Sequence, residues 1–348
     1  MAEAVLTTEA LRLVAPANDE QTGSLQAFAW PEMRSSYAAQ PGYPLVPMTD
    51  RSQPQPVRLA WEMSSLAPDG WHYDLHLSTC PDLSEARVWT GLAQNSLEIS
   101  GLRAGTRYYW KVVGHGPEET ACESEPASFT THPALPRWLR VEGITNCRDA
   151  GGWPCGEGRR VRQGLVFRSS EMNSHFCISP AGKHLLEEEL GIRTDLDLRG
   201  DEEETIPCLD PQRVCYVNTP VGAYEEILGD FCKAGLLLAF ETLGRRDSYP
   251  LLVHCWGGAD RTGTLVFLLN GLLGVGLPDL IHDYEATSLS VFGPRLADAG
   301  SFQNLLRVLR GFGGPGDGLS DQIQAYLLSI GVKEETLAAI RSILIEPN

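Results

Sequence analysis

The chain has 348 residues, of which 43% are hydrophobic and 21% are charged, as in ordinary globular proteins. This length exceeds that of one average domain, so two domains are expected. The formal net charge of −17 argues against binding to nucleic acid or to an anionic membrane, because both are polyanions that attract basic surfaces.

The first 50 residues show no sustained hydrophobic period, so no fold is assigned to them. Residues 1–30 lack the basic segment and apolar core of a signal peptide. The chain has no apolar run of about 18 residues, and its longest candidate, 265–275, is too short to span a membrane. A soluble protein is expected, and its compartment is left open.

Short alternating segments, typical of half-buried strands, follow from about residue 56. They are residues 57–61, 73–77, 96–99, 106–113 and 127–131. This spacing predicts an all-β sandwich over residues 51–132.

The same segment resembles a fibronectin type III module. The resemblance rests on Leu59-x-Trp61, on Leu102 with Thr106-x-Tyr108-Tyr109-Trp110-x-Val112, and on the ending at Phe129. We assign no chemistry to this domain, and its partner is unknown.

A proline-containing linker, residues 131–136, separates this segment from alternating strands and helices. The pattern predicts a helix at 180–190, strands at 193–199 and 250–253, and a buried helix at 262–273. We therefore expect an α/β domain over residues 133–348, with a central, mostly parallel sheet flanked by helices.

Cys255 and Arg261 form a C-x5-R motif at the junction between the last predicted strand and the buried helix. The spacing alone is weak evidence in a chain with nine cysteines. Its context is stronger, because a strand, a tight loop and a helix N-terminus together make an anion site. Gly257 and Gly258 allow the backbone amides of such a loop to turn inward.

Each residue type in this loop has a chemical role to play. The helix dipole and Arg261 would acidify Cys255, which can then attack phosphorus as a thiolate. The guanidinium of Arg261 matches two phosphoryl oxygens, and the hydroxyl of Thr262 can hydrogen-bond the sulfur. His254 is expected to orient the loop. The predicted phosphate-binding residues are Trp256, Gly257, Gly258, Ala259, Asp260 and Arg261.

Residues 254–263 resemble the phosphate loop of protein tyrosine phosphatases, and more narrowly a microbial group of tyrosine or dual-specificity phosphatases with Asp before the loop Arg. Similar segments occur in the same order along the chain, at residues 146–152, 164–170, 191–203, 283–284 and 325–344. The resemblance implies a phosphoric monoester hydrolase that works through a cysteinyl-phosphate intermediate, without metal or cofactor.

The resemblance also suggests Asp260 as the general acid, since no Trp-Pro-Asp loop is present. The alternative is that Asp260 orients Arg261 or caps the helix. Asp197 and Asp201 are further candidates, for which an ion pair at the strand end is an equal explanation. Arg148 is expected to support the site, by touching substrate or through a surface ion pair.

Two loop residues bear on the substrate. Related loops that favour phosphoinositides often carry a lysine where this chain has Ala259, and Trp256 adds an aromatic ring. We therefore favour phosphotyrosine, in a phosphorylated protein or a small aryl phosphate ester. The alternatives are a phosphoinositide or inositol phosphate phosphatase of the same superfamily, a sulfurtransferase, and a catalytically weak phosphate-binding or adhesion module.

Overall fold

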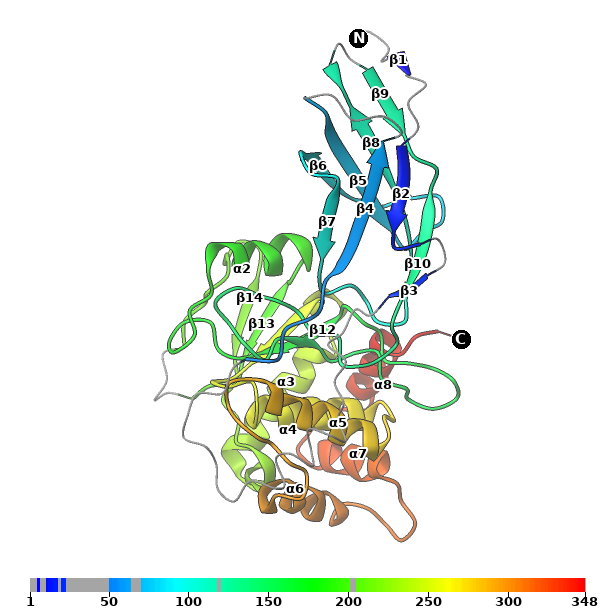
Figure 1. Cartoon of the computed structure of the whole chain (residues 1–348). Helices are drawn as coiled ribbons and strands as arrows, with labels where there is room; N and C mark the ends of the chain where they lie inside the picture. Colours follow the sequence, from blue (N-terminus) through cyan, green and yellow to red (C-terminus); the bar gives the residue numbers. More distant parts are fainter. Residues whose placement is uncertain are drawn as a thin grey trace. The chain divides into compact units, whose positions relative to one another are not determined.

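A computed structural model describes residues 5–6, 11–17, 20–22, 50–63, 70–117, 120–200 and 205–347. The described residues form two compact units. The first, the β unit, holds the described residues up to 22 together with 54–134, and the second, the catalytic unit, holds residues 50–53 and 135–347 (Figure 1). Most of the first 50 residues, to which the sequence assigned no fold, lie outside the described residues.

The β unit consists of two sheets. Its strands are β1 (Val5–Leu6), β2 (Leu11–Ala15), β3 (Glu20–Thr22), β4 (Val57–Met63), β5 (His72–Ser78), β6 (Arg87–Leu92), β7 (Ser96–Ile99), β8 (Arg107–His115), β9 (Thr120–Glu123) and β10 (Ala127–Thr131). One sheet runs β1-β9-β8-β10-β3, with β5 paired to β8 and β6 paired to β5, and the other runs β2-β4-β7.

Side chains from both sheets meet in one buried cluster. Leu59 and Trp61 come from β4, whereas Leu75, Trp110 and Phe129 come from the larger sheet, and each is fully buried. The alternation that predicted these strands therefore marks the faces that meet in the core. The sequence did not predict β6, because none of its side chains is buried and it shows no apolar face.

The catalytic unit is built on a five-stranded sheet. Its strands are β11 (Arg148–Asp149), β12 (Val166–Ser169), β13 (Thr194–Asp197), β14 (Cys215–Asn218) and β15 (Leu251–His254). The sheet order is β11-β12-β15-β13-β14. Four strands are parallel to their neighbours, and β11 runs antiparallel to β12 at one edge.

Helical segments cover both faces of this sheet (Figure 1). They are α2 (Pro180–His184), the π-helical η2 (Leu185–Glu189), the 3-10 helices η3 (Tyr224–Leu228), η4 (Arg246–Ser248) and η5 (Thr287–Leu289), and the helices α3 (Asp230–Leu243), α4 (Arg261–Leu272), α5 (Leu277–Ala286), α6 (Gly300–Arg310), α7 (Leu319–Ser329) and α8 (Glu334–Leu344). The predicted helix at 180–190 is thus an α-helix that continues as a π-helical turn.

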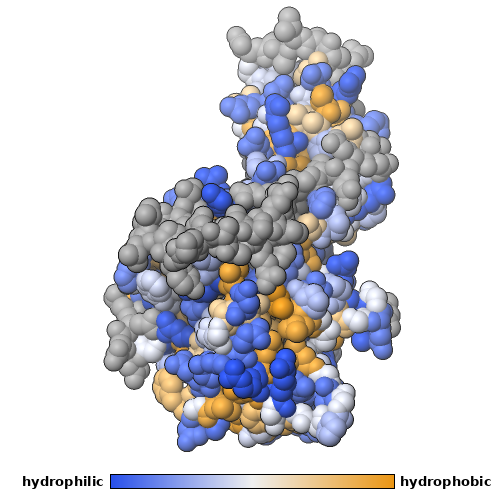
Figure 2. All heavy atoms as spheres, turned by 60° about the horizontal axis from the view of Figure 1, so that its bottom comes forward, coloured by the Kyte–Doolittle hydropathy of each residue, from blue (hydrophilic) through white to orange (hydrophobic). Residues whose placement is uncertain are grey.

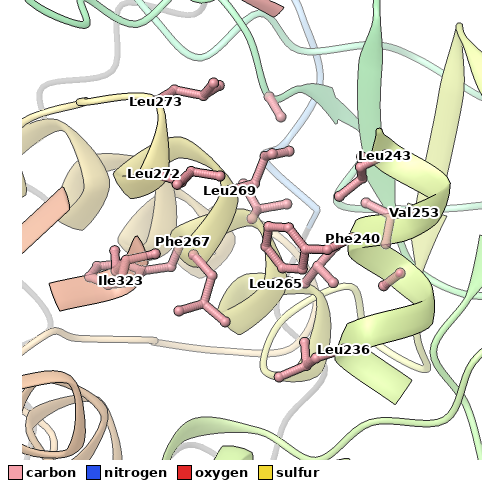
Figure 3. Close-up of a cluster of buried hydrophobic side chains, with 14 of the residues drawn as sticks. Leu236, Phe240, Leu243, Val253, Leu265, Phe267, Leu269, Leu272, Leu273 and Ile323 are labelled. Atoms are coloured by element: carbon pink, nitrogen blue, oxygen red, sulfur yellow. The ribbon is translucent and has the colours of Figure 1, made fainter. Parts of the chain in front are cut away.

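Strand β15 is buried on both faces. Leu251 and Val253 face a cluster shared with α3 and α4, and Leu252 faces the cluster on the opposite side, next to Phe167. Figure 3 shows side chains of α3 and α4 packed together with Val253. This packing fixes the end of β15 and the start of α4, and hence the loop between them.

Three further features concern chemistry. All nine cysteines are free thiols. Within the described residues, no group of three or more His, Cys, Asp or Glu side chains is arranged to hold a metal ion. No helix in that part of the chain is long and apolar enough to cross a membrane.

Candidate active site

The central strand β15 ends at His254, and Cys255 follows it directly. Residues 256–260 form a loop, and α4 begins at Arg261. Strands β12 and β13 flank β15 in parallel, so the carboxyl ends of three strands meet where the loop starts. Cys255 is almost fully buried, with 2% of its surface exposed. The thiol therefore lies between the end of the central strand and the N-terminus of a buried helix.

The carbonyl groups of this loop accept hydrogen bonds from other segments. The backbone N–H of Glu171 donates to the carbonyl of Trp256 at 3.0 Å. The side-chain amide of Asn146 donates to both carbonyls of residues 257–258 at 3.1 Å. Nη2 of Arg168 donates to the second of these carbonyls at 2.7 Å. Asn146 and the segment around the end of β12, which lie more than 100 and more than 80 residues before the loop, thus hold its first half.

The N–H groups of the loop are left for another partner. The carbonyls of residues 259–260 accept bonds at 3.0 and 2.8 Å from the backbone of α4, so all five carbonyls are engaged. Among the residues that the structure describes, none accepts a hydrogen bond from the N–H groups of residues 256–260. Buried amides are almost always paired in folded proteins, so such a loop is typical of an anion site. The dipole of α4 adds to the attraction.

One position in the loop requires glycine. Gly258 has a φ of +62°, and a Cβ atom there would lie 2.1 Å from the carbonyl oxygen of Ser169. Gly257 has no positive φ, and its Cβ would make only a tight contact of 3.2 Å with the ring of Phe292. The conformational freedom predicted for both glycines is thus required at Gly258, where the loop presses against the end of β12.

Two buried arginines support the loop from below. Arg148 and Arg168 are both fully buried, and both pair with Asp283 on α5, at 3.0 and 2.6 Å. Nη1 of Arg148 also donates to the side-chain oxygen of Asn146, whose amide holds the loop. Burial alone would raise the pKa of Asp283, but the two guanidinium groups outweigh it and hold the pKa below its ordinary value.

The predicted role of Arg148 needs a correction. A surface ion pair or a contact with substrate was expected, but Arg148 is 0% exposed and its partners are Asp283, Thr287 and Asn146. The sequence did not reveal the buried pairing, because the carboxylate of Asp283 lies 135 residues further along the chain. Arg148 acts on the loop through Asn146.

His254 is fully enclosed at the end of β15. Its Nε2 lies 3.0 Å from Asp195, and its Nδ1 lies 3.7 Å from Asp197. Burial is the largest single influence and lowers the pKa of His254, but the carboxylates of Asp195 and then Asp197 outweigh it, so the pKa is raised. Through its contacts with these two carboxylates, the imidazole connects β15 to β13 next to the start of the loop.

Asp197 also belongs to this buried layer. Its carboxylate accepts bonds from Nε and Nη2 of Arg199, at 2.9 and 2.7 Å, and from the hydroxyl of Tyr216 at 2.8 Å. Burial raises its pKa, but His254 and Arg199 outweigh this, so the pKa is lowered. Asp197 is placed in the strand-end ion pair that the sequence gave as the alternative to catalysis. Asp201, the other alternative, lies outside the described residues.

Asp260 lies at the mouth of the loop and is held by three donors. Nε and Nη2 of Arg295 donate to its two oxygens at 2.9 and 3.1 Å, and the hydroxyl of Tyr224 donates to Oδ1. Tyr224 in turn hydrogen-bonds the hydroxyl of Tyr284 at 2.7 Å. The side chain of Asp260 makes no capping bond to α4, although it occupies the N-cap position. Its partner is Arg295, which the sequence did not single out.

These donors determine the charge of Asp260. Burial raises its pKa, but Arg295, Tyr224 and Arg261 outweigh burial, so the pKa lies below its ordinary value. Asp260 is therefore a carboxylate at neutral pH when the loop holds no anion.

Arg261 and Thr262 form the first turn of α4. Arg261 is partly buried and lines a pocket beside the loop. Thr262 is fully buried, and its hydroxyl has no hydrogen-bond partner among the described residues. A buried hydroxyl in this state can donate to a charged acceptor that forms close to it.

Trp256 is the exposed member of the loop, with 41% of its surface accessible. Its Nε1 donates to Nδ1 of His175 at 2.8 Å, and its ring lies 5.3 Å from that of Phe292. The ring of Phe176 contacts Phe292 at 5.4 Å. Trp256 is therefore held in a small aromatic group at the rim of the loop.

The pocket next to the loop has a volume of about 630 Å³. It is lined by Gly200, Pro220, Val221, Gly222, Ala223, Glu226, Gly229, Phe231, Cys232, Asp260 and Arg261. Its walls are mainly apolar, and Arg261 is the cation among these lining residues.

Four residues that hold the site were not given roles from the sequence: Asn146, Asp283, Tyr224 and Arg295. Asn146 and Asp283 fall in segments that resemble the phosphatase group, and each is completely or almost completely buried. A buried polar residue in such a segment is a usable signal, since it must have a partner. Tyr224, at the start of η3, and Arg295, in a loop, lie in segments without any comparable pattern.

Comparison with known proteins gives a family. The model of a family described as "Tyrosine phosphatase family" matches residues 139–346, more than half of the chain. A protein of Cupriavidus necator named "putative tyrosine-protein phosphatase" is 29% identical over 172 residues, which are 42% of this chain and 61% of the relative. A "tyrosine-protein phosphatase" of Nostoc commune is 26% identical over 121 residues, 28% of this chain and 41% of the relative. The chain thus spans about three fifths or less of these relatives.

Among solved structures, the catalytic core of the PP-IP phosphatase Siw14 from S. cerevisiae, crystallised with citrate, is similar at 21% identity and a TM-score of 0.31. The match covers 40% of this chain and 79% of that one. The family match extends from Leu139 to beyond α8, and so includes the loop of Cys255 and the residues that hold it. The chain belongs to the tyrosine phosphatase family, a family of phosphoric monoester hydrolases.

Proposed function

We propose that the catalytic unit hydrolyses phosphate monoesters through Cys255, and that its substrates are aryl phosphates, above all phosphotyrosine. The observation that carries this proposal is the loop at residues 256–260, whose carbonyls are all engaged and whose amides have no acceptor among the described residues. An oxyanion placed there would lie beside the Cys255 thiol and the N-terminus of α4.

In the first step the Cys255 thiolate attacks phosphorus in line with the leaving oxygen. The S–P bond forms as the P–O bond breaks, and Asp260, once protonated, gives its proton to the leaving oxygen. The guanidinium of Arg261 and the loop amides bind the three remaining phosphoryl oxygens, where charge builds up. The products are a free alcohol or phenol and a cysteinyl-phosphate.

In the second step a water molecule attacks the same phosphorus. Asp260 takes a proton from the water, the S–P bond breaks, and the electron pair returns to sulfur as inorganic phosphate forms. The unpartnered hydroxyl of Thr262 supports a role in this step, because a hydrogen bond to the sulfur would stabilise the departing thiolate.

Asp260 must be protonated before it can act as an acid, yet Arg295 and Tyr224 lower its pKa. The substrate resolves this conflict. A phosphate dianion bound in the loop is a like charge beside the carboxylate, and a like charge raises a carboxyl pKa. Turnover of esters with poor leaving groups is therefore expected to be fastest at mildly acidic pH and to fall as Asp260 loses its proton.

The Arg295→Met variant tests this account of Asp260. Removing the guanidinium raises the pKa of Asp260, so the alkaline limb of the pH profile should move up by about one pH unit or more. We would measure kcat/KM for phenyl phosphate between pH 4 and 8. Arg295→Lys keeps the charge and should shift the limb less.

The comparison with Asp260→Asn completes this test. In that variant the alkaline limb should be absent. Its kcat/KM should fall more for phenyl phosphate than for p-nitrophenyl phosphate, whose leaving group needs little protonation. A limb that stays in place in Arg295→Met would remove Asp260 from the role of acid.

The pocket beside the loop supports an aryl substrate. Its walls are formed by apolar residues such as Pro220, Val221 and Phe231, which suit a flat apolar ring. No lysine is among the described residues that line it, and Glu226 adds negative charge. An inositol polyphosphate would need several cations to bind its further phosphates, whereas one phosphoryl group needs only the loop and Arg261.

The decisive assay for activity uses p-nitrophenyl phosphate. Hydrolysis should be inhibited by vanadate and unaffected by EDTA, since no step uses a metal. Absence of hydrolysis would instead favour a non-catalytic phosphate-binding module. With phosphotyrosine peptides, phosphoserine peptides, phosphoinositides and inositol phosphates compared at one pH, we expect the highest kcat/KM for phosphotyrosine. A preference for inositol phosphates would contradict the proposed substrate class.

We further propose domain limits of 51–132 for a fibronectin type III module and 133–348 for the phosphatase domain. The two sheets and shared core of the β unit support the first assignment. Strands β1, β2 and β3 of the N-terminal segment add to its sheets, whereas residues 51–53 group with the catalytic unit.

A further inference from the structure

The outer face of α3 carries an exposed apolar stripe. Leu228 precedes the helix, and Phe231 and Leu238 lie on it; their surfaces are 45%, 66% and 43% exposed. Seven residues make about two helical turns, so Phe231 and Leu238 point to the same side of α3, with the exposed Ala234 between them. Large apolar side chains are rarely exposed in a row without a binding role.

This stripe is continuous with the pocket at the loop. Phe231, at the start of α3, lines that pocket together with Asp260 and Arg261. Leu238 lies two turns further along the same helix. Figure 2 shows exposed apolar residues among strongly polar ones on the surface of the protein. An occupant of the stripe would therefore run directly from the phosphate site onto α3.

The dimensions and the charge of this surface fit a polypeptide. Two turns of helix cover about 10 Å, which is the length of about three residues of extended chain. Acidic residues border the stripe: Glu225 and Glu226 at one end, and Asp230 and Glu241 on α3, all exposed. Lys233 pairs with Asp230 at 3.2 Å, so the other three carboxylates carry the negative charge. A polyanion would be repelled here, whereas a segment with apolar and basic side chains would be attracted.

We propose that the stripe formed by Leu228, Phe231, Ala234 and Leu238 binds the polypeptide next to the phosphotyrosine of a protein substrate. The inference rests on the proposed function and narrows it, from aryl phosphates in general to phosphorylated polypeptides. Apolar residues within about three positions of the phosphotyrosine contact the stripe, while the phosphoryl group occupies the loop. A small aryl phosphate reaches the loop without touching Leu228 or Leu238.

The test compares Leu238→Glu and Leu228→Glu with the unaltered protein. The substrates are p-nitrophenyl phosphate and two phosphotyrosine peptides, one with leucine and valine at the three positions on each side and one with serine and glycine there. We expect the unaltered protein to prefer the apolar peptide. Each substitution should lower kcat/KM for that peptide about fivefold, as expected for losing half of one leucine contact, and leave p-nitrophenyl phosphate within twofold.

Ile206→Glu is the matched control, because Ile206 is 48% exposed and lies outside the stripe. It adds the same charge and should change none of the three rates. The proposal is overturned if the unaltered protein shows no preference between the two peptides. It is also overturned if the stripe variants retain the preference for the apolar peptide, or if Ile206→Glu removes that preference to the same extent. If the unaltered protein does not hydrolyse p-nitrophenyl phosphate, the proposed function is overturned, and this inference with it.

Discussion

Cys255→Ser is expected to lower kcat/KM for p-nitrophenyl phosphate by about a thousandfold or more. A serine hydroxyl remains protonated at neutral pH and is a far weaker nucleophile than a thiolate. The loop amides and Arg261 are unchanged, so calorimetry should still detect phosphate binding with little loss of affinity. Because the carbonyls of the loop are held from other segments, the substitution should not disturb its shape.

The control for this prediction is Cys215→Ser. Cys215 is an exposed thiol at the start of β14 in the same unit, and its loss should leave turnover unchanged. Turnover that survives in Cys255→Ser would remove Cys255 from the role of nucleophile. Loss of phosphate binding together with turnover would show that the sulfur is part of the anion site itself.

Asp283→Ala is expected to be the most destabilising single substitution in the catalytic unit, at about 3–5 kcal/mol. It leaves Arg148 and Arg168 fully buried without their shared carboxylate. A surface pair is the suitable comparison: Glu188→Ala breaks the pair with Arg213, whose side chain is 48% exposed, and should cost less than about 1 kcal/mol. Chemical denaturation followed by tryptophan fluorescence measures both values.

The contribution of the Asp283 ion pairs to stability should also appear in the pH dependence of the free energy of unfolding. The folded pKa of Asp283 is lowered, so its contribution is complete above the unfolded value of about 4 and is lost as the pH falls through the folded value. The difference in unfolding free energy between the unaltered protein and Asp283→Asn should therefore shrink on acidification. A difference independent of pH would show that Asp283 acts through packing alone.

The sequence predicts the parts of this protein that depend on neighbouring residues. The junction of β15, the loop and α4 is local, and its limits in the structure differ by one residue from the predicted ones. The pairing of Arg148 with Asp283 joins residues 135 positions apart, and that of Asp260 with Arg295 joins residues 35 apart. Side-chain type and spacing hold no information about such partners.

The same limit explains the uncertain role of Asp260. The family resemblance suggested an acid, and the place of Asp260 beside Arg261 at the start of the helix suggested that it orients Arg261 or caps the helix. The structure shows that the carboxylate turns away from the N–H groups of α4 and towards Arg295 and Tyr224. Tyr224 begins η3, which packs against α6, and Arg295 lies in the loop before α6, so their positions depend on tertiary packing.

The loop amides are aligned by Asn146, Arg168, Glu171 and α4 while the chain folds, before any anion arrives. Dipoles that are already oriented need no reorganisation during the reaction, whereas water around a free phosphate ester must turn as charge moves. The enthalpy of phosphate binding should accordingly contain little contribution from ordering the loop. In a urea titration, turnover should be lost in the same transition in which the catalytic unit unfolds, because the shape of the site depends on the fold that surrounds it.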